Sequence, residues 1–115
     1  MDREPRDHWA RGRLRDIEAT PDTGERFETL ATFGGVVVEQ ILSAATGASV
    51  DAYDQAQDEW VVVLAGAATL EVDDANGPTT VDLGPGDWLF LPAHTPHRVM
   101  ATEAGTNWIA VHLHP

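Results

Sequence analysis

The sequence of 115 residues contains no cysteine, which excludes disulfide bonds, thiolate metal sites and a cysteine nucleophile. It also lacks any apolar run close to the roughly 18 residues that a membrane-spanning helix requires. Residues 1–16 are densely charged and hold none of the apolar stretch that defines a signal peptide. We therefore expect a cytoplasmic protein, with a flexible arm over residues 1–12 and a single folded domain over residues 13–115.

Basic residues are scarce too. Seven lysine and arginine residues stand against nineteen aspartate and glutamate residues, for a net charge of −12. A field of that sign repels phosphate groups, so nucleic acids and anionic membrane surfaces are poor partners. Phosphate-binding glycine loops, the Gly-x-Ser-x-Gly elbow and the zinc-protease pattern are all missing. Any chemistry must therefore be inferred from other residues.

What the sequence does contain is a series of short strand patterns. Residues 60–64 are continuously apolar, which is typical of a strand buried on both faces. Residues 107–113 alternate, with Trp108, Ala110 and His112 on one face. Short strands with a turn every eight to twelve residues predict an all-β sandwich or barrel. We expect strands over residues 36–43, 60–64, 67–73, 80–83, 87–91, 97–101 and 107–113, a weak strand over 13–18, and a strand or short helix over 25–33.

The most informative stretch is residues 84–99. A glycine-rich turn ends at Gly86, and a short strand follows until Pro92, which cannot donate to a sheet ladder. A second turn then leads to His97, the first residue of the next strand. This stretch resembles the second motif of the cupin superfamily, a glycine, five residues and a proline that precede a metal-ligand histidine. His94 stands in the place of the second motif glycine.

The first cupin motif is matched in part. Glu59, six residues and Gly66 fit its carboxylate and glycine positions, while Tyr53 and Gln55 occupy the places of its two histidines. Three runs, at residues 53–55, 58–64 and 108–112, are similar to small single-domain bacterial cupins to which no activity is assigned. The resemblance implies a jelly-roll barrel, also called a double-stranded β-helix, with these side chains directed into one interior.

The resemblance also implies a candidate site for a divalent transition metal. The expected ligands are His97, Glu59, Gln55 and, from the last strand, His112. An imidazole nitrogen and a carboxylate oxygen suit Fe, Mn, Co, Ni or Zn, whereas an amide offers only a neutral oxygen. The candidate catalytic residues are Glu59, His97 and Tyr53, whose phenol is normally protonated at neutral pH.

Three functions stay open at this point. The first is a metal-dependent enzyme built on Glu59 and His97. The second is a metal-free barrel that binds a small polar molecule or transfers protons, as some isomerases do, with His97 and Glu59 as base and acid. The third is a binding module without turnover. Fold alone does not choose among them.

The apolar run also predicts a homodimer. Val61 and Val63 share the parity of Glu59 and are expected to face inward, so Trp60, Val62 and Leu64 face outward. Soluble monomers seldom expose such a patch, and closed homodimers are the commonest oligomers. We expect the N-terminal segment to cover part of this face. The residues that would make that contact are Phe27 and Leu30.

Overall fold

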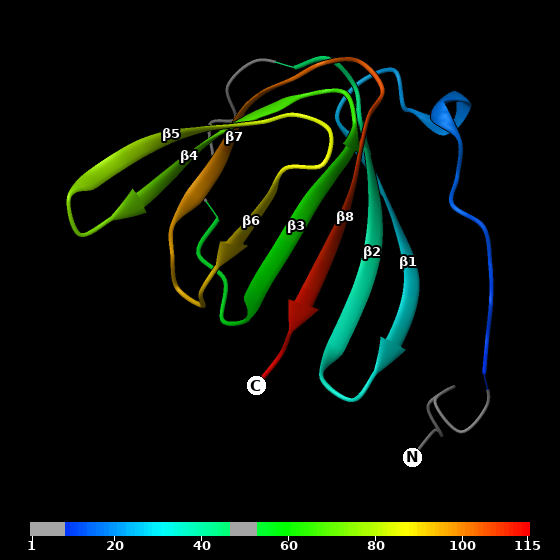
Figure 1. The fold of residues 1–115 in the computed structure, drawn as a ribbon, viewed down its shortest axis with the longest axis horizontal. Coiled ribbons are helices and arrows are strands. Elements are labelled where there is room, and N and C mark those ends of the chain that lie inside the picture. Colours follow the sequence, from blue (N-terminus) through cyan, green and yellow to red (C-terminus); the bar gives the residue numbers. More distant parts are fainter. Residues whose placement is uncertain (1–8, 47–52) are drawn as a thin grey trace.

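The computed structural model describes residues 9–46 and 53–115, which form eight strands in two antiparallel sheets (Figure 1). One sheet has the order β1-β2-β8-β3-β6 and the other the order β5-β4-β7. No helix among these residues is long and apolar enough to cross a membrane. The elements are the 3-10 turn η2 (Ile17–Ala19) and strands β1 (Glu25–Phe33), β2 (Val36–Ser43), β3 (Asp58–Ala65), β4 (Ala68–Asp74), β5 (Gly77–Leu83), β6 (Trp88–Leu91), β7 (His97–Thr102) and β8 (Thr106–Leu113).

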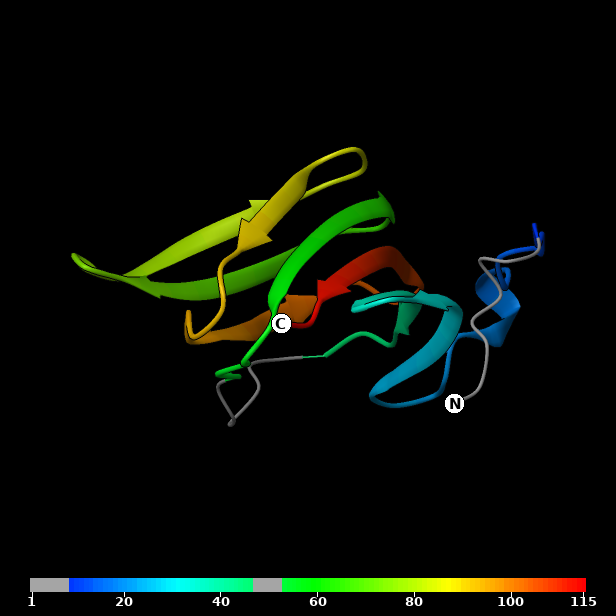
Figure 2. The same cartoon turned by 90° about the horizontal axis from the view of Figure 1, so that it is seen from below.

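The hydrophobic core lies between the two sheets. Ile41, Val63 and Trp108 contribute to it from the five-stranded sheet, and Leu70 and Leu83 from the three-stranded sheet. Seen from below, the β4–β5 hairpin and strand β1 lie at opposite sides of the molecule (Figure 2). The predicted all-β jelly roll is confirmed.

Strand β1 settles the choice between strand and helix over residues 25–33. Its apolar residues Phe27, Leu30 and Phe33 are spaced by three, which suggested a helix. The pairing of β1 with β2 shifts register between Thr29 and Ala31, so a bulge at this point inverts the alternation. The spacing of three therefore comes from an irregular strand.

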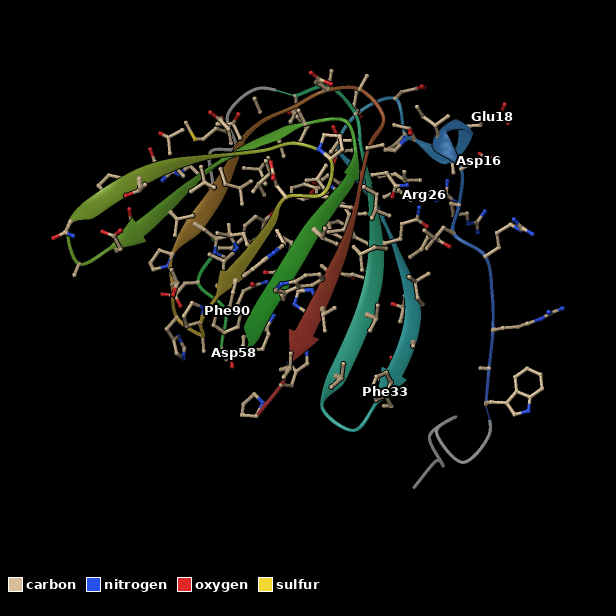
Figure 3. All side chains as sticks on the ribbon, in the orientation of Figure 1. Asp16, Glu18, Arg26, Phe33, Asp58 and Phe90 are labelled. Carbon is tan, nitrogen blue, oxygen red and sulfur yellow. The ribbon has the colours of Figure 1, made fainter. Side chains whose placement is uncertain are left out.

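The weak strand expected over residues 13–18 is wrong. Residues 13–16 form no strand, and η2 begins at Ile17 with Asp16 as its N-cap (Figure 3). The Asp16 carboxylate accepts a hydrogen bond from the Glu18 N–H at 3.0 Å, which favours a turn over extended backbone. Gln40, which is fully buried, holds this segment through both the N–H and the carbonyl of Arg15, at 2.8 and 2.9 Å.

Strand β5 is longer than expected. We predicted this strand over residues 80–83, but β5 already begins at Gly77 and includes Pro78. Pro78 is tolerated because β5 is an edge strand, where a proline costs no ladder hydrogen bond.

The outer face of the five-stranded sheet is apolar, as the continuous run in β3 predicts. Trp60 and Val62 are half-buried there and pair in register with Phe90 and Trp88 of β6. Trp88 is 61% exposed and Phe90 48% exposed. Phe27, expected to help cover this face, instead lines the interior, because it pairs with the inward residue Ile41.

Candidate functional site

A cavity of about 200 Å³ opens into the interior between the two sheets. Its walls are mostly apolar, and its polar side chains are glutamates, histidines, one tyrosine and one glutamine. Two lining residues, Phe27 (53%) and Tyr53 (44%), are strongly exposed and mark its mouth. The lining residues are Glu25, Phe27, Glu39, Ile41, Tyr53, Gln55, Glu59, Val61, Leu70, Leu91, His97, Val99, Trp108 and His112.

All five residues predicted for the site line this cavity. Glu59 on β3 and His112 on β8 are register partners in the five-stranded sheet. His97 begins β7 in the other sheet, so the two sheets deliver imidazole and carboxylate from opposite walls. Tyr53 is fixed beside it by a backbone bridge, in which the Tyr53 N–H donates to His97 O at 2.6 Å and the His97 N–H donates to Tyr53 O at 3.0 Å. Gln55 lies on the same connection, and its carbonyl accepts from the His94 N–H at 2.7 Å.

His97 and Glu59 face each other without a direct hydrogen bond. The Nδ1 atom of His97 lies 2.9 Å from the Thr95 carbonyl, which can only accept, so Nδ1 carries the proton. The lone pair of Nε2 is then directed into the cavity, 3.8 Å from Glu59 Oε1. Both residues are 8% exposed, and Glu59 Oε1 has no hydrogen-bond partner among the described residues. A buried oxygen in this condition normally has a ligand, an ion or a water beside it.

Burial raises the pKa of the Glu59 carboxyl above its usual value of 4.5. Electrostatic interactions with His112 and His97 oppose this increase in pKa, whereas Glu39 and Glu25 add to it. Glu59 therefore holds a proton more readily than an exposed glutamate.

His112 is engaged elsewhere. Its Nε2 lies 2.8 Å from Glu39 Oε2, and its Nδ1 lies 3.2 Å from the amide nitrogen of Gln57. The hydrogen bond to Glu39 raises the pKa of His112, against the opposing effect of desolvation. Both ring nitrogens are occupied, so His112 shares the cavity with Glu59 but does not offer it a free donor atom.

The cavity also holds a carboxylate, that of Glu25, which the sequence reasoning missed. Glu25 Oε2 accepts a hydrogen bond from the Ser43 hydroxyl at 2.8 Å, and that hydroxyl accepts one from the Trp108 indole N–H at 3.0 Å. Burial raises the pKa of Glu25, although the serine hydrogen bond lowers it in part. Strand parity was a usable signal, because residues two positions apart point to the same face. Glu25 shares the inward face with Phe27, and Glu39 shares it with Ile41.

The donor atoms present fit a metal ion only in part. His97 Nε2 and Glu59 Oε1 are a nitrogen and an anionic oxygen that transition metals accept, and the Thr95 hydrogen bond fixes the imidazole tautomer as in many metal sites. Across the described ranges, however, no group of three or more histidine and acidic side chains is arranged to hold a metal. Further ligands would have to come from Gln55, Tyr53 or the bound molecule.

His94 lies outside the cavity. It is exposed and pairs with Asp54, with Nδ1 3.0 Å from Oδ1. Its φ of 62° is the left-handed conformation that favours glycine, which explains why a glycine is the usual residue of the motif at this position.

Residues 40–114 match the family model described as the cupin domain. The chain belongs to the cupin family. This cupin is 36% identical to a proposed mannose-6-phosphate isomerase from Ralstonia eutropha JMP134, with a TM-score of 0.72 over 90% of this chain and 100% of that one. The structure of cobalt(II) HppE with its substrate is 23% identical, with a TM-score of 0.64 over 78% of this chain and 52% of HppE, and shows the shared fold.

One curated enzyme shows a shorter match. Oxalate decarboxylase OxdC of Bacillus subtilis (strain 168) is 32% identical over 54 residues, which are 46% of this cupin and 14% of the enzyme. The chain thus corresponds to a small part of that protein.

Proposed function

We propose that this cupin binds a small polar molecule in its barrel cavity, together with a divalent transition metal held by His97 and Glu59. The observation that carries the proposal is the pair of buried atoms His97 Nε2 and Glu59 Oε1, 3.8 Å apart and without a hydrogen bond between them. A bound metal would supply Lewis acidity, which polarises an oxygen of the bound molecule. Gln55 and Tyr53, which line the same cavity, would orient that molecule.

A second candidate is proton transfer without a metal. It is favoured by the small number of strong metal ligands among the described residues and by the raised pKa of Glu59. The lone pair of His97 can accept a proton, and Glu59 can donate one once it is protonated. At a separation of 3.8 Å, both groups can contact one proton-bearing atom of the bound molecule that lies to the side of the line joining them. The apolar walls at Val61 and Leu91 would keep water out.

Metal content separates the two candidates. We expect protein purified without added metal, or chelated and reloaded with Mn, Fe, Co, Ni or Zn, to hold a metal by elemental analysis. His97→Ala and Glu59→Ala should each lose it, whereas His94→Ala should keep it, because His94 is exposed and paired with Asp54. Equal metal content in wild type and His97→Ala would contradict the metal site. Metal-free wild type that still binds small molecules would favour proton transfer.

A further inference from the structure

Glu25 carries a charge that no described residue compensates with a salt bridge. Glu39 is paired with His112 at 2.8 Å, and Glu59 faces His97. Within the described part of the chain, the side-chain partner of Glu25 is a neutral hydroxyl, that of Ser43. A carboxylate has two oxygens, and the serine uses one of them.

No arginine among the described residues lines the cavity. The chain contains no lysine, and Arg3 and Arg6 lie outside the described residues. Arg15 and Arg26 pair with Glu28 on the outside, and Arg98 pairs with Glu71. Among the described residues, three carboxylates therefore share this interior with two histidines and no permanently charged cation. The two remaining arginines of the described part, Arg11 and Arg13, line a separate surface groove.

Aromatic side chains flank the uncompensated carboxylate. Phe27 follows Glu25 by two positions on β1 and lines the same cavity, and the Trp108 indole is joined to Glu25 through Ser43. A carboxylate beside aromatic rings is a setting in which proteins bind organic cations. A second observation also indicates a bound molecule here, because Glu59, nine-tenths buried, presents an oxygen without a partner to the same cavity.

We infer that the molecule bound by this cupin carries a positively charged nitrogen, held by Glu25 beside Phe27 and Trp108. Its other end bears an oxygen that reaches the His97–Glu59 pair. This inference rests on the proposed function, since it names the class of molecule that the same cavity takes. A small amino alcohol has this chemistry.

The inference separates this cupin from its relative described as a phosphosugar isomerase. A phosphate group is normally bound by arginine, lysine or a row of backbone N–H groups, and this interior offers carboxylates instead.

Three probes of one length test the inference: linear aminobutanol, butanediol and hydroxybutyrate, each with its groups at the two chain ends. Binding is followed at the Trp108 indole N–H resonance by proton NMR, assigned with Trp108→Phe. We expect saturable binding of the amine, at least about tenfold tighter than the diol, and none by the acid or by mannose 6-phosphate. The inference is overturned if the diol, the acid or mannose 6-phosphate binds as tightly as the amine or more tightly, or if binding of the amine does not saturate.

The matched variants are Glu25→Gln and Glu103→Gln. Both remove one negative charge, but Glu103 is exposed and outside the cavity. A glutamine at position 25 can still accept from Ser43, so we expect the fold to persist, as the four tryptophan indole resonances would show. Glu25→Gln should weaken amine binding at least about tenfold and leave diol binding unchanged, while Glu103→Gln should change neither. Equal dissociation constants for the amine in both variants overturn the inference.

Metal content keeps this test distinct from that of the proposed function. Glu25→Gln should contain as much metal as wild type. A wild type that holds no metal but prefers the amine would refute the metal site and support the amine site. If the wild type holds a metal that His97→Ala lacks, but binds the acid more tightly than the amine, the metal site would be supported and the amine site refuted.

Discussion

Gly66 is the position where one methyl group should do most damage to this fold. It lies directly after β3, at the turn into β4, with a φ of +85°, a conformation that side chains other than glycine rarely adopt. A Cβ atom built on it would lie 2.5 Å from Thr106 Oγ1 and 2.7 Å from Thr106 Cα. Both distances are too short for real contacts, so one backbone or the other must move.

A shift of Thr106 would break hydrogen bonds that its hydroxyl makes. Its hydroxyl lies 2.8 Å from Glu103 O and 3.1 Å from Ala67 O, and it accepts from the Ala67 N–H at 3.2 Å. The left-handed backbone costs about 1–2 kcal/mol, and the overpacking adds about 1–3 kcal/mol. Gly66→Ala should therefore lower the free energy of unfolding by about 2–5 kcal/mol, a large part of the roughly 5–15 kcal/mol that a domain has.

Gly77→Ala is the matched control. Gly77 has a φ of +100°, but its Cβ would meet nothing within 4 Å, so only the backbone cost of about 1–2 kcal/mol applies. Urea unfolding at constant pH, followed by tryptophan fluorescence, gives both free energies. Equal losses for the two variants, with unchanged m-values, would refute the argument that contact with Thr106 makes Gly66 special.

Two further predictions concern pH and assembly. Burial raises the pKa of Glu25 and Glu59 above 4.5, and a hydrogen bond raises that of His112 above 6.5, so the folded state binds more protons than the unfolded chain. For metal-free protein we expect the free energy of unfolding to rise as the pH falls from above 6.5 toward 4.5; a fall in urea titrations over that range would contradict this. The apolar outer face predicts a homodimer, so sedimentation should report about twice 12.4 kDa, and Trp60→Glu or Trp88→Glu should halve it. A wild-type monomer at micromolar concentration would count against the dimer.

Strands were predictable where the sequence has a regular pattern, either a β-branched run or an alternation of apolar residues. The β-branched run of β2 gave correct bounds, and the alternation of β8 placed Trp108, Ala110 and His112 on the buried face. The strand predicted over residues 13–18 was wrong, because the Asp16 cap favours the turn η2. Strand and helix both stayed open for residues 25–33, because the bulge in β1 interrupts its alternation.

The sequence predicted that Glu59 and His97 share one interior, but it did not predict their hydrogen-bond partners. Strand parity and motif spacing place both side chains inside the barrel, and both line the cavity. The partner of His112 depends on which strand lies beside β8, and β2 brings Glu39 there from far away in the sequence. Gln57 lies in a connection without periodicity, so no pattern indicates that it contacts His112.

The place of β8 in the five-stranded sheet has a consequence for how the protein is made. β8 follows every other described strand in the sequence, yet it lies between β2 and β3. Val36 of β2 pairs with Leu113, so this ladder joins residues 77 positions apart in the sequence. During synthesis, β2 and β3 each present an unpaired edge until residues 106–113 have left the ribosome. The five-stranded sheet therefore cannot close until β8 is available, and until then both open edges can pair with another chain.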